Sequence, residues 1–438
     1  MLSIEDNKLL TEVGPGTPMG DLMRRYWQPV CAVAELAASA FRTRELRILG
    51  EELVVYRDRS GKLGMVAANC AHRRAKLAYG IVEEDGIRCA YHGWKFDSTG
   101  ACLEQPFEDT THPEDRFRDK CSLPAYPVQE LAGLIWAYMG PAPAPLLPRW
   151  GPLVWENCVR DIGIVELPCS WLQCQENTLD PVHTEWLHQY GGSYYRSLLK
   201  GEEPSLGHEP QHLKVGFDVF EHGIIKRRLT VGQTEESDPW KTGHPSLFPN
   251  ILLSGNPLQN QMQFRVPQDD THTRHFTVHT WQAAPGSKAP TQEMVPARQI
   301  PLRDDDGNFL DIGVFFMQDY LMWVNQGEIA LRHREKLGES DKGVILFRKQ
   351  LLEQVQRVIQ GLEPALNVFR DEASNQCIEL PLEGFRYRPP AATGTSASQR
   401  PSVARYIPTE PGRSADADKI EAVMATWESL AQKTSAAV

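Results

Sequence analysis

The sequences CAHRRAKL, residues 70–77, and CAYHGWKFD, residues 89–97, decide how the first part of this chain folds. Each holds one cysteine and one histidine, Cys70 with His72 and Cys89 with His92, and about a hairpin's length of chain lies between them. Two thiolates on one iron and two imidazoles on the other make a mixed-ligand [2Fe-2S] centre. We therefore predict that these four side chains hold such a centre, on two loops that each leave the end of a strand.

Two other uses of these residues compete with this prediction. A zinc site also accepts two cysteines and two histidines, but zinc fingers usually place a cysteine pair before a histidine pair, whereas here each loop carries one of each. A disulfide requires an oxidising compartment, and the nine cysteines of this chain come without a secretion signal. The pattern favours the iron-sulfur centre, with zinc as the open alternative.

The length and charge of the chain limit its possible partners. Its 438 residues exceed one typical hydrophobic core and predict two domains. The net charge of −11 and the lack of a dense basic run argue against nucleic acid or an anionic membrane as a partner. The start MLSIEDNKLL is acidic, and no apolar run is long enough to span a bilayer. We expect a cytoplasmic protein.

Hydrophobic patterning divides the chain into an all-β part and a mixed part. Short β-compatible runs punctuated by glycine come first, and strands mixed with helical segments follow. The fold class is therefore α+β rather than doubly wound. The expected strands include 45–49, 53–56, 65–68, 224–230 and 274–281, and the expected helices include 171–190 and 343–362.

A proline-rich stretch after residue 140 predicts a stiff connection between two domains. We place the first domain at 1–145, beginning with a short helical arm, and the second at 146–388. Residues 389–438 are expected to be a flexible linker rich in Pro, Ala, Ser, Thr and Gly, followed by an amphipathic helix at 415–433.

A second group of metal-binding residue types lies in NTLDPVHTEWLH, residues 177–188. His183 and His188 are candidate ligands, but an interval of five residues is poorer than four for sharing one helix face. Metal binding therefore requires Pro181 or a local bulge to re-aim the two rings. The alternative is a pair of surface histidines hydrogen-bonded to water. The predicted iron-sulfur centre makes this alternative weaker, because a one-electron donor needs an electron acceptor.

A third ligand is expected from a distant carboxylate. Two histidines and one carboxylate on one face of Fe(II) leave open positions for O2 and other ligands. Asp319 follows the apolar run Phe315-Phe-Met-Gln and is our choice, with Asp371 and Glu372 as replacements. An ordinary helix-capping carboxylate is the other interpretation of Asp319.

The motifs at residues 70–77 and 89–97 resemble those of the Rieske non-haem iron oxygenases. The opening Gly14-Pro-Gly-Thr-Pro-Met-Gly and Arg24-Arg-Tyr-Trp-Gln-Pro resemble the branch of phthalate dioxygenase and the dehydrodivanillate O-demethylases. Resemblance covers most of the chain to about residue 386. It implies an N-terminal Rieske domain and a helix-grip catalytic domain, in which an antiparallel sheet is packed with helices.

The same resemblance implies roles for residues 177–188, which match the family's motif Asn-x2-Asp-x2-His-x4-His. His183 and His188 are implied as ligands of a mononuclear iron, and the segment around Asp319 resembles the one that supplies the family's carboxylate ligand. Asn177 is a candidate for orienting a ligand or water near the iron, although a purely structural amide is an equal alternative.

Asp180 is implied to lie between two subunits. In the family the matching carboxylate bonds both to a Rieske histidine, here His92 of one chain, and to an iron ligand, here His183 of the next. This arrangement implies a homotrimer or a stacked hexamer with electron transfer between subunits. A carboxylate that accepts from both rings fixes their orientation, whereas a helix N-cap before Pro181 is the alternative.

The implied activity is that of a terminal oxygenase, which uses O2 and externally supplied electrons to oxidise an aromatic and often carboxylated compound. We favour monooxygenation with loss of an O-methyl group. A cis-dihydroxylating phthalate- or benzoate-type dioxygenase is the alternative, and a non-enzymatic Rieske electron carrier is a further one. Because no dinucleotide-binding fingerprint is visible, a separate NAD(P)H-dependent reductase, with or without a ferredoxin, is the implied partner.

Lys226 and Arg227 are the candidate substrate residues. Either could pair with a substrate carboxylate, since arginine in particular recognises planar carboxylates through two parallel hydrogen bonds. A charged and solvated strand face is the competing interpretation of these two positions.

Overall fold

Small antiparallel sheets form the N-terminal part of the protein. The structure is a computed structural model that describes residues 2–203, 211–255, 259–382 and 415–435. One three-stranded sheet has the order β2-β3-β4, a four-stranded sheet has the order β5-β6-β7-β8, and a second three-stranded sheet has the order β1-β10-β9. The strands are β1 (Gln28–Ala32), β2 (Thr43–Ile48), β3 (Glu51–Arg57), β4 (Leu63–Ala67), β5 (Ile81–Val82), β6 (Ile87–Arg88), β7 (Lys95–Phe96), β8 (Cys102–Glu104), β9 (Val128–Leu131) and β10 (Leu134–Ala137).

The larger part of the protein is built on one sheet of eight described strands, in the order β12-β13-β14-β15-β16-β17-β11-β18. Neighbouring strands are antiparallel except for the parallel pair β11 and β18. This sheet and its helices confirm the predicted α+β class. The strands are β11 (Cys158–Leu167), β12 (His212–Phe220), β13 (Gly223–Thr230), β14 (His244–Leu247), β15 (Ile251–Gly255), β16 (Gln259–Pro267), β17 (Thr273–Gln282) and β18 (Ala297–Gln299).

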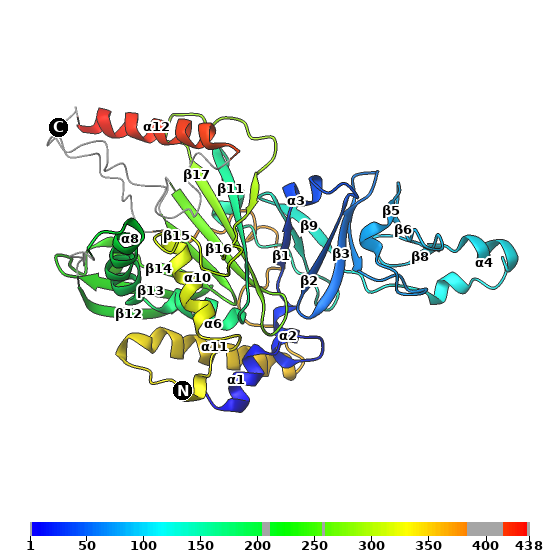
Figure 1. The fold of residues 1–438 in the computed structure, drawn as a ribbon, viewed down its shortest axis with the longest axis horizontal. Coiled ribbons are helices and arrows are strands. Elements are labelled where there is room, and N and C mark those ends of the chain that lie inside the picture. Colours follow the sequence, from blue (N-terminus) through cyan, green and yellow to red (C-terminus); the bar gives the residue numbers. More distant parts are fainter. Residues whose placement is uncertain (1, 204–210, 256–258, 383–414, 436–438) are drawn as a thin grey trace.

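Helices pack around this sheet, and three of them, α6, α7 and α10, frame the site described below. Figure 1 shows α10 and α6 beside the sheet, with α11, α1 and α2 together below it and α12 across its far end. The helices are α1 (Ile4–Thr11), α2 (Pro18–Met23), α3 (Val33–Ala37), α4 (Pro106–Thr111), α5 (Gly151–Val154), α6 (Trp171–Glu176), α7 (His183–Glu185), α8 (Gly192–Lys200), α9 (Asp238–Lys241), α10 (Phe315–Asn325), α11 (Lys342–Ile359) and α12 (Ala417–Ser435).

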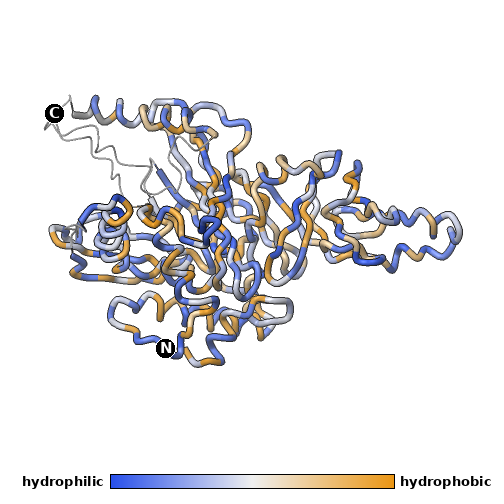
Figure 2. The backbone as a smooth tube through the Cα atoms, viewed as in Figure 1, coloured by the Kyte–Doolittle hydropathy of each residue, from blue (hydrophilic) through white to orange (hydrophobic). Residues whose placement is uncertain are grey.

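The longer helices follow from their apolar spacing. In α11 the buried residues Val344, Phe347, Leu351, Val355 and Val358 recur every three or four positions, which puts them on one face. Figure 2 shows hydrophobic segments along the strands, while the loop that projects around α4 is coloured mainly white and blue.

None of the described helices is both long and apolar enough to cross a membrane.

One hydrophobic core runs through both parts of the chain. It contains Met23 and Trp136 from the N-terminal part together with Ile162, Phe264 and Leu351 from the large sheet and its helices. The division at residue 145 stays a prediction, and the predicted linker, from residue 389 to the expected helix at 415, lies outside the described residues. At the C-terminal end of the described chain, α12 packs on β11 and β17.

Candidate functional site

The first cysteine-histidine loop begins where β4 ends, and the second connects β6 to β7. Each loop is closed by a backbone hydrogen bond, from the Cys70 N–H to the Ala75 carbonyl at 2.9 Å and from the Cys89 N–H to the Trp94 carbonyl at 2.8 Å. Gly93 has φ +77°, a conformation that favours glycine and lets the chain turn tightly after the second histidine. The strand-end loops expected from the sequence are therefore present.

The four predicted cluster ligands come together, with the two cysteine thiols buried and the two histidine rings exposed to solvent. Cys70 and Cys89 are 1% and 3% exposed, whereas His72 and His92 are exposed. The two imidazole rings lie 4.5 Å apart between centroids, and His72 stacks on Trp94 at 4.6 Å. Burial raises the pKa of the Cys70 thiol to about 11, and the neighbouring Cys89 thiol adds to this rise. Two buried adjacent thiols become thiolates when a metal binds them, so this donor set fits a mixed-ligand [2Fe-2S] cluster.

The second group lies where the chain leaves α6. The backbone passes through a 3₁₀ turn at Asn177–Leu179 and the short helix α7, and then forms a π-helix at Trp186–Gly191. The wider turn of a π-helix is the local bulge that the five-residue interval requires. As a result the rings of His183 and His188 lie 5.1 Å apart between centroids.

Asp319 reaches the same point from α10, more than a hundred residues later. Its Oδ1 lies 3.3 Å from Nε2 of His188 and 3.7 Å from Nε2 of His183. One donor atom from each of the three residues lies within 4.8 Å of the others, and Asp319 is only 4% exposed. Nε2 of His188 is buried, makes no hydrogen bond within the described part of the chain, and faces the Asp319 carboxylate. Two imidazoles and a carboxylate whose polar atoms face one another fit a divalent iron ion.

The replacement carboxylates lie elsewhere. Asp371 and Glu372 are exposed, and Asp371 accepts the backbone N–H of Ser374 at 2.9 Å in a turn. His183, His188 and Asp319 are the described residues whose ligand atoms lie close enough together to hold a single metal ion.

Asn177 and Asp180 both contact this group. The Asn177 side-chain amide donates to Oδ1 of Asp319 at 3.3 Å and lies 3.5 Å from Nε2 of His183. Asp180 accepts the backbone N–H groups of Val182 and His183 through Oδ1, as an N-cap does, and its Oδ2 lies 3.5 Å from Nδ1 of His183. Asp180 therefore caps the start of the helix and also contacts the ring of His183, a candidate metal ligand.

A polar cavity of about 1370 Å³ opens beside the three residues. Lys226 lines it, is 6% exposed, and donates to the backbone carbonyl of Asp180 at 3.4 Å. Burial, followed by the nearby Arg228, lowers the pKa of Lys226 to about 7. An anion beside this amine would raise its pKa and keep it charged.

Strand alternation places the second predicted substrate residue outside the cavity. Arg227 donates to Asp218 and to the backbone carbonyls of Trp240 and Lys241, and it is not among the cavity residues. Arg228, two positions after Lys226 on β13, lines the cavity instead. Successive residues of a strand point to opposite faces of the sheet. Lys226 and Arg228 therefore point to the cavity, and Arg227 points to the other face.

Arg265 is a cavity residue that the sequence analysis missed. It is 1% exposed on β16, its guanidinium donates to Oε1 of Gln263 at 2.7 Å, and no carboxylate in the described ranges forms an ion pair with it. Burial lowers its pKa to about 10. Its signal in the sequence is the run Gln261, Gln263 and Arg265, polar residues at every second position, and all three are buried in the strand.

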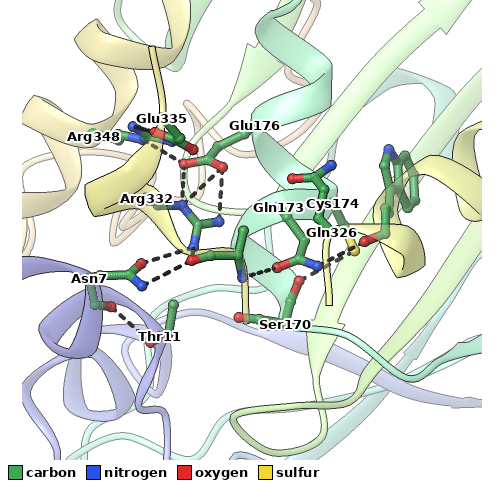
Figure 3. A network of polar contacts seen from close by, with 12 residues as sticks. Asn7, Thr11, Ser170, Gln173, Cys174, Glu176, Gln326, Arg332, Glu335 and Arg348 are labelled. Atoms are coloured by element: carbon green, nitrogen blue, oxygen red, sulfur yellow. Dashed lines mark hydrogen bonds and ion pairs between the residues drawn. The ribbon is translucent and has the colours of Figure 1, made fainter. Parts of the chain in front are cut away.

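A buried network behind the cavity holds the supporting helices together (Figure 3). Glu176, at the end of α6, bonds to Arg332 at 2.9 Å and to Arg348 of α11 at 2.6 Å. Gln173 of α6 donates to the carbonyls of Trp323 at 2.8 Å and Gly327 at 2.7 Å, at the C-terminal end of α10. The helix that leads to the histidines is thus tied to the helix that carries Asp319.

Comparison with known proteins gives matches in both parts of the chain. Residues 26–127 match the family described as Rieske [2Fe-2S] domain, and residues 292–376 match the family described as LigXa C-terminal domain like. The chain is 44% identical over 382 residues to the 5,5'-dehydrodivanillate O-demethylase oxygenase subunit of a Sphingobium species, covering 87% of each protein. It is 33% identical to the phthalate 4,5-dioxygenase oxygenase subunit of Pseudomonas putida, covering 81% of this chain and 86% of that one.

Solved structures show the same fold. NdmA of Pseudomonas putida CBB5 with caffeine superposes with a TM-score of 0.58 at 21% sequence identity, covering 84% of this chain and 99% of that chain. The oxygenase of a carbazole 1,9a-dioxygenase complex with ferredoxin superposes with a TM-score of 0.53 at 19% identity, covering 83% of this chain and 98% of that one.

Proposed function

The chain belongs to the Rieske non-haem iron oxygenases, and from this premise we propose that it removes the O-methyl group of a methoxylated aromatic acid. It is an oxidoreductase with a Rieske [2Fe-2S] cluster and a non-haem iron as cofactors, O2 as co-substrate, and electrons supplied by a reductase. When bound, the cluster and the iron supply one-electron transfer and oxygen activation. The residues described above determine where the substrate lies and how the two centres are held.

One observation carries the proposal. The three candidate iron ligands His183, His188 and Asp319 converge at the wall of a cavity that is also lined by Lys226 and Arg265. A buried cation without a carboxylate partner is costly unless a ligand supplies the negative charge. An aromatic acid placed with its carboxylate or phenolate toward these cations would present another ring substituent to the iron.

The reaction balances for an aryl methyl ether. The ether, O2, two electrons and two protons give the phenol, formaldehyde and one water, because oxygen is inserted into a methyl C–H bond and the resulting hemiacetal breaks its C–O bond. In this scheme Lys226, Arg228 and Arg265 hold the anionic end of the substrate. Asn177 donates to Asp319 and so restrains the orientation of that carboxylate.

The proposed route for electrons passes between subunits. We place Asp180 between His183 of one subunit and His92 of the partner subunit, in a homotrimer or a stacked hexamer. Two features support this: His92 is exposed at the tip of its loop, and Asp180 keeps one carboxylate oxygen near His183. A reductase, with or without a ferredoxin, is proposed as the donor, and the cytoplasm as the compartment.

Reconstituted turnover tests the proposed reaction. The reconstituted chain, with cluster, Fe(II), NADH and a reductase, would be given methoxybenzoates, a methoxylated biphenyl diacid and phthalate. Formaldehyde formed in equal amount to the phenol supports O-demethylation. A ring diol formed without formaldehyde would replace it with the dihydroxylation suggested by the phthalate 4,5-dioxygenase relative.

A further inference from the structure

The first turn of α10 contacts the His188 ring in three ways. Phe315 stacks on the ring, with 3.4 Å between centroids and 17° between planes. Gln318 places its side-chain Oε1 3.0 Å from Nδ1 of His188, and Asp319 places its carboxylate 3.3 Å from Nε2. These positions, i, i+3 and i+4, lie on one face of a helix, so a single helical turn surrounds the ring.

The two histidines differ in the group behind them. His183 has the Asp180 carboxylate 3.5 Å from its Nδ1, whereas His188 has the neutral amide of Gln318 3.0 Å from its Nδ1. An iron ion held by His188 and Asp319 would take the lone pair of Nε2, so the ring proton would then belong on Nδ1 and be donated to Gln318. The amide thus fixes the tautomer without adding a second negative charge to a buried site that already contains Asp319.

Gln318 is held in position by its surroundings. Its side chain is 0% exposed, and the segment that faces it begins with Gly192. A Cβ atom on Gly192 would lie 2.9 Å from Nε2 of Gln318, closer than a side-chain carbon can approach without displacing it. Because residue 192 is a glycine, there is room beside it for the Gln318 amide.

We propose that Gln318 is a positioning residue for the iron site, which holds His188 as a neutral ligand with its Nε2 directed at the metal. This inference rests on the proposed function only in assuming that iron binds at His183, His188 and Asp319. Hydrogen bonds of this kind orient metal-bound imidazoles, and their loss commonly costs about 10- to 100-fold in metal affinity or activity.

The experiment measures Fe(II) affinity under anaerobic conditions, on the full chain with its cluster intact and its mononuclear iron removed. Gln318→Met keeps the side-chain volume but has no strong acceptor, and we expect it to weaken Fe(II) binding about 10- to 100-fold. Gln318→Glu keeps the acceptor but adds a buried charge, so it should weaken Fe(II) binding less than Gln318→Met does. Gln326→Met, at the exposed end of the same helix, is the matched control.

A second variant leaves Gln318 unchanged. Gly192→Ala suits the helix in which residue 192 lies, but its methyl group would displace the Gln318 amide, so it should weaken Fe(II) binding in the same direction. Cluster absorption and the thermal midpoint report whether each variant folds. Wild-type affinity in Gln318→Met, or equal losses in Gln318→Met and Gln318→Glu, would overturn the inference. A wild-type chain that binds no Fe(II) would instead overturn the proposed iron site.

Discussion

The Asp180 carboxylate divides its two oxygens between the backbone and His183. Oδ1 accepts the N–H of Val182 at 2.9 Å and that of His183 at 3.3 Å, while Oδ2 lies 3.5 Å from Nδ1 of His183. Burial raises the pKa of Asp180, but His183 and then Lys226 outweigh burial and hold the pKa at about 2. Asp180 is therefore ionised at neutral pH and can accept a hydrogen bond from the His183 N–H.

Replacing Asp180 by asparagine separates its two roles. Asparagine is an equally good N-cap, so Asp180→Asn should preserve the local backbone and the loading of both iron centres. It removes the charge that faces His183, and we expect electron transfer from the cluster to the mononuclear iron to slow by about 10- to 100-fold. Stopped-flow measurement of cluster oxidation checks this rate. Turnover at the wild-type rate would remove the proposed bridge between subunits.

Substitution of Arg265, but not of Arg227, should change how the enzyme responds to the charge of the substrate. Arg265→Met should raise KM for a methoxybenzoate, because a hydrogen bond to a charged group is worth about 1.5–3 kcal/mol, or roughly 10- to 100-fold. The neutral methyl ester of the same compound should show a much smaller change. Arg227→Gln is the control, since that side chain bonds to Asp218 outside the cavity. Equal effects of Arg265→Met on the acid and its ester would contradict anion recognition by Arg265.

The buried Glu176 should matter more for stability than an exposed carboxylate of α11. Glu176→Gln leaves the Arg332 and Arg348 guanidinium groups, 0% and 4% exposed, without their shared anion. Breaking a buried pair in this way costs about 3–5 kcal/mol. Glu353→Gln removes an exposed partner 3.8 Å from Lys349, a kind of contact worth about 0–1 kcal/mol. Urea unfolding followed by far-UV circular dichroism compares the two variants, and equal midpoints would contradict the importance of the network.

His279 predicts a loss of stability on mild acidification. Burial, followed by Arg298, lowers its pKa to about 3, whereas an unfolded chain has a histidine pKa of about 6.5. Below that value the unfolded chain binds a proton that the folded chain does not, so stability falls as the pH falls from about 6.5 toward 3. The loss from this residue is about 2 kcal/mol at pH 5. His279→Gln should reduce the difference in urea midpoint between pH 7 and pH 5, and an unchanged difference would contradict this prediction.

Two features could be predicted from short stretches of sequence: the cluster site, and the need for a local bulge that redirects the two histidine rings. Both depend on residues close in the chain, and spacing alone indicates that His183 and His188 are poorly placed to share one face of a regular helix. The π-helix at Trp186–Gly191 supplies the required change. Asp319 could be selected only as a carboxylate after an apolar run, because its distance from the histidines depends on how α10 packs against α6.

The substrate cavity shows where sequence reasoning is weaker. Lys226 and Arg227 are adjacent basic residues, and without the register of β13 either could face inward. The pairing of β13 with β14 decides this, and it turns Lys226 and Arg228 to the cavity. Arg265 belongs to a strand that the sequence analysis did not single out. Its importance comes from burial without a carboxylate partner, a property of the folded protein rather than of the sequence.

Iron analysis tests the central claim most directly. The wild-type chain, reconstituted with iron and sulfide under anaerobic conditions, should hold about three irons, two in the cluster and one mononuclear. Asp319→Ala should hold about two irons with unchanged cluster absorption, because it removes one ligand of the mononuclear site and leaves Cys70, His72, Cys89 and His92 intact. Two irons in both proteins, or zinc in place of iron, would contradict the account.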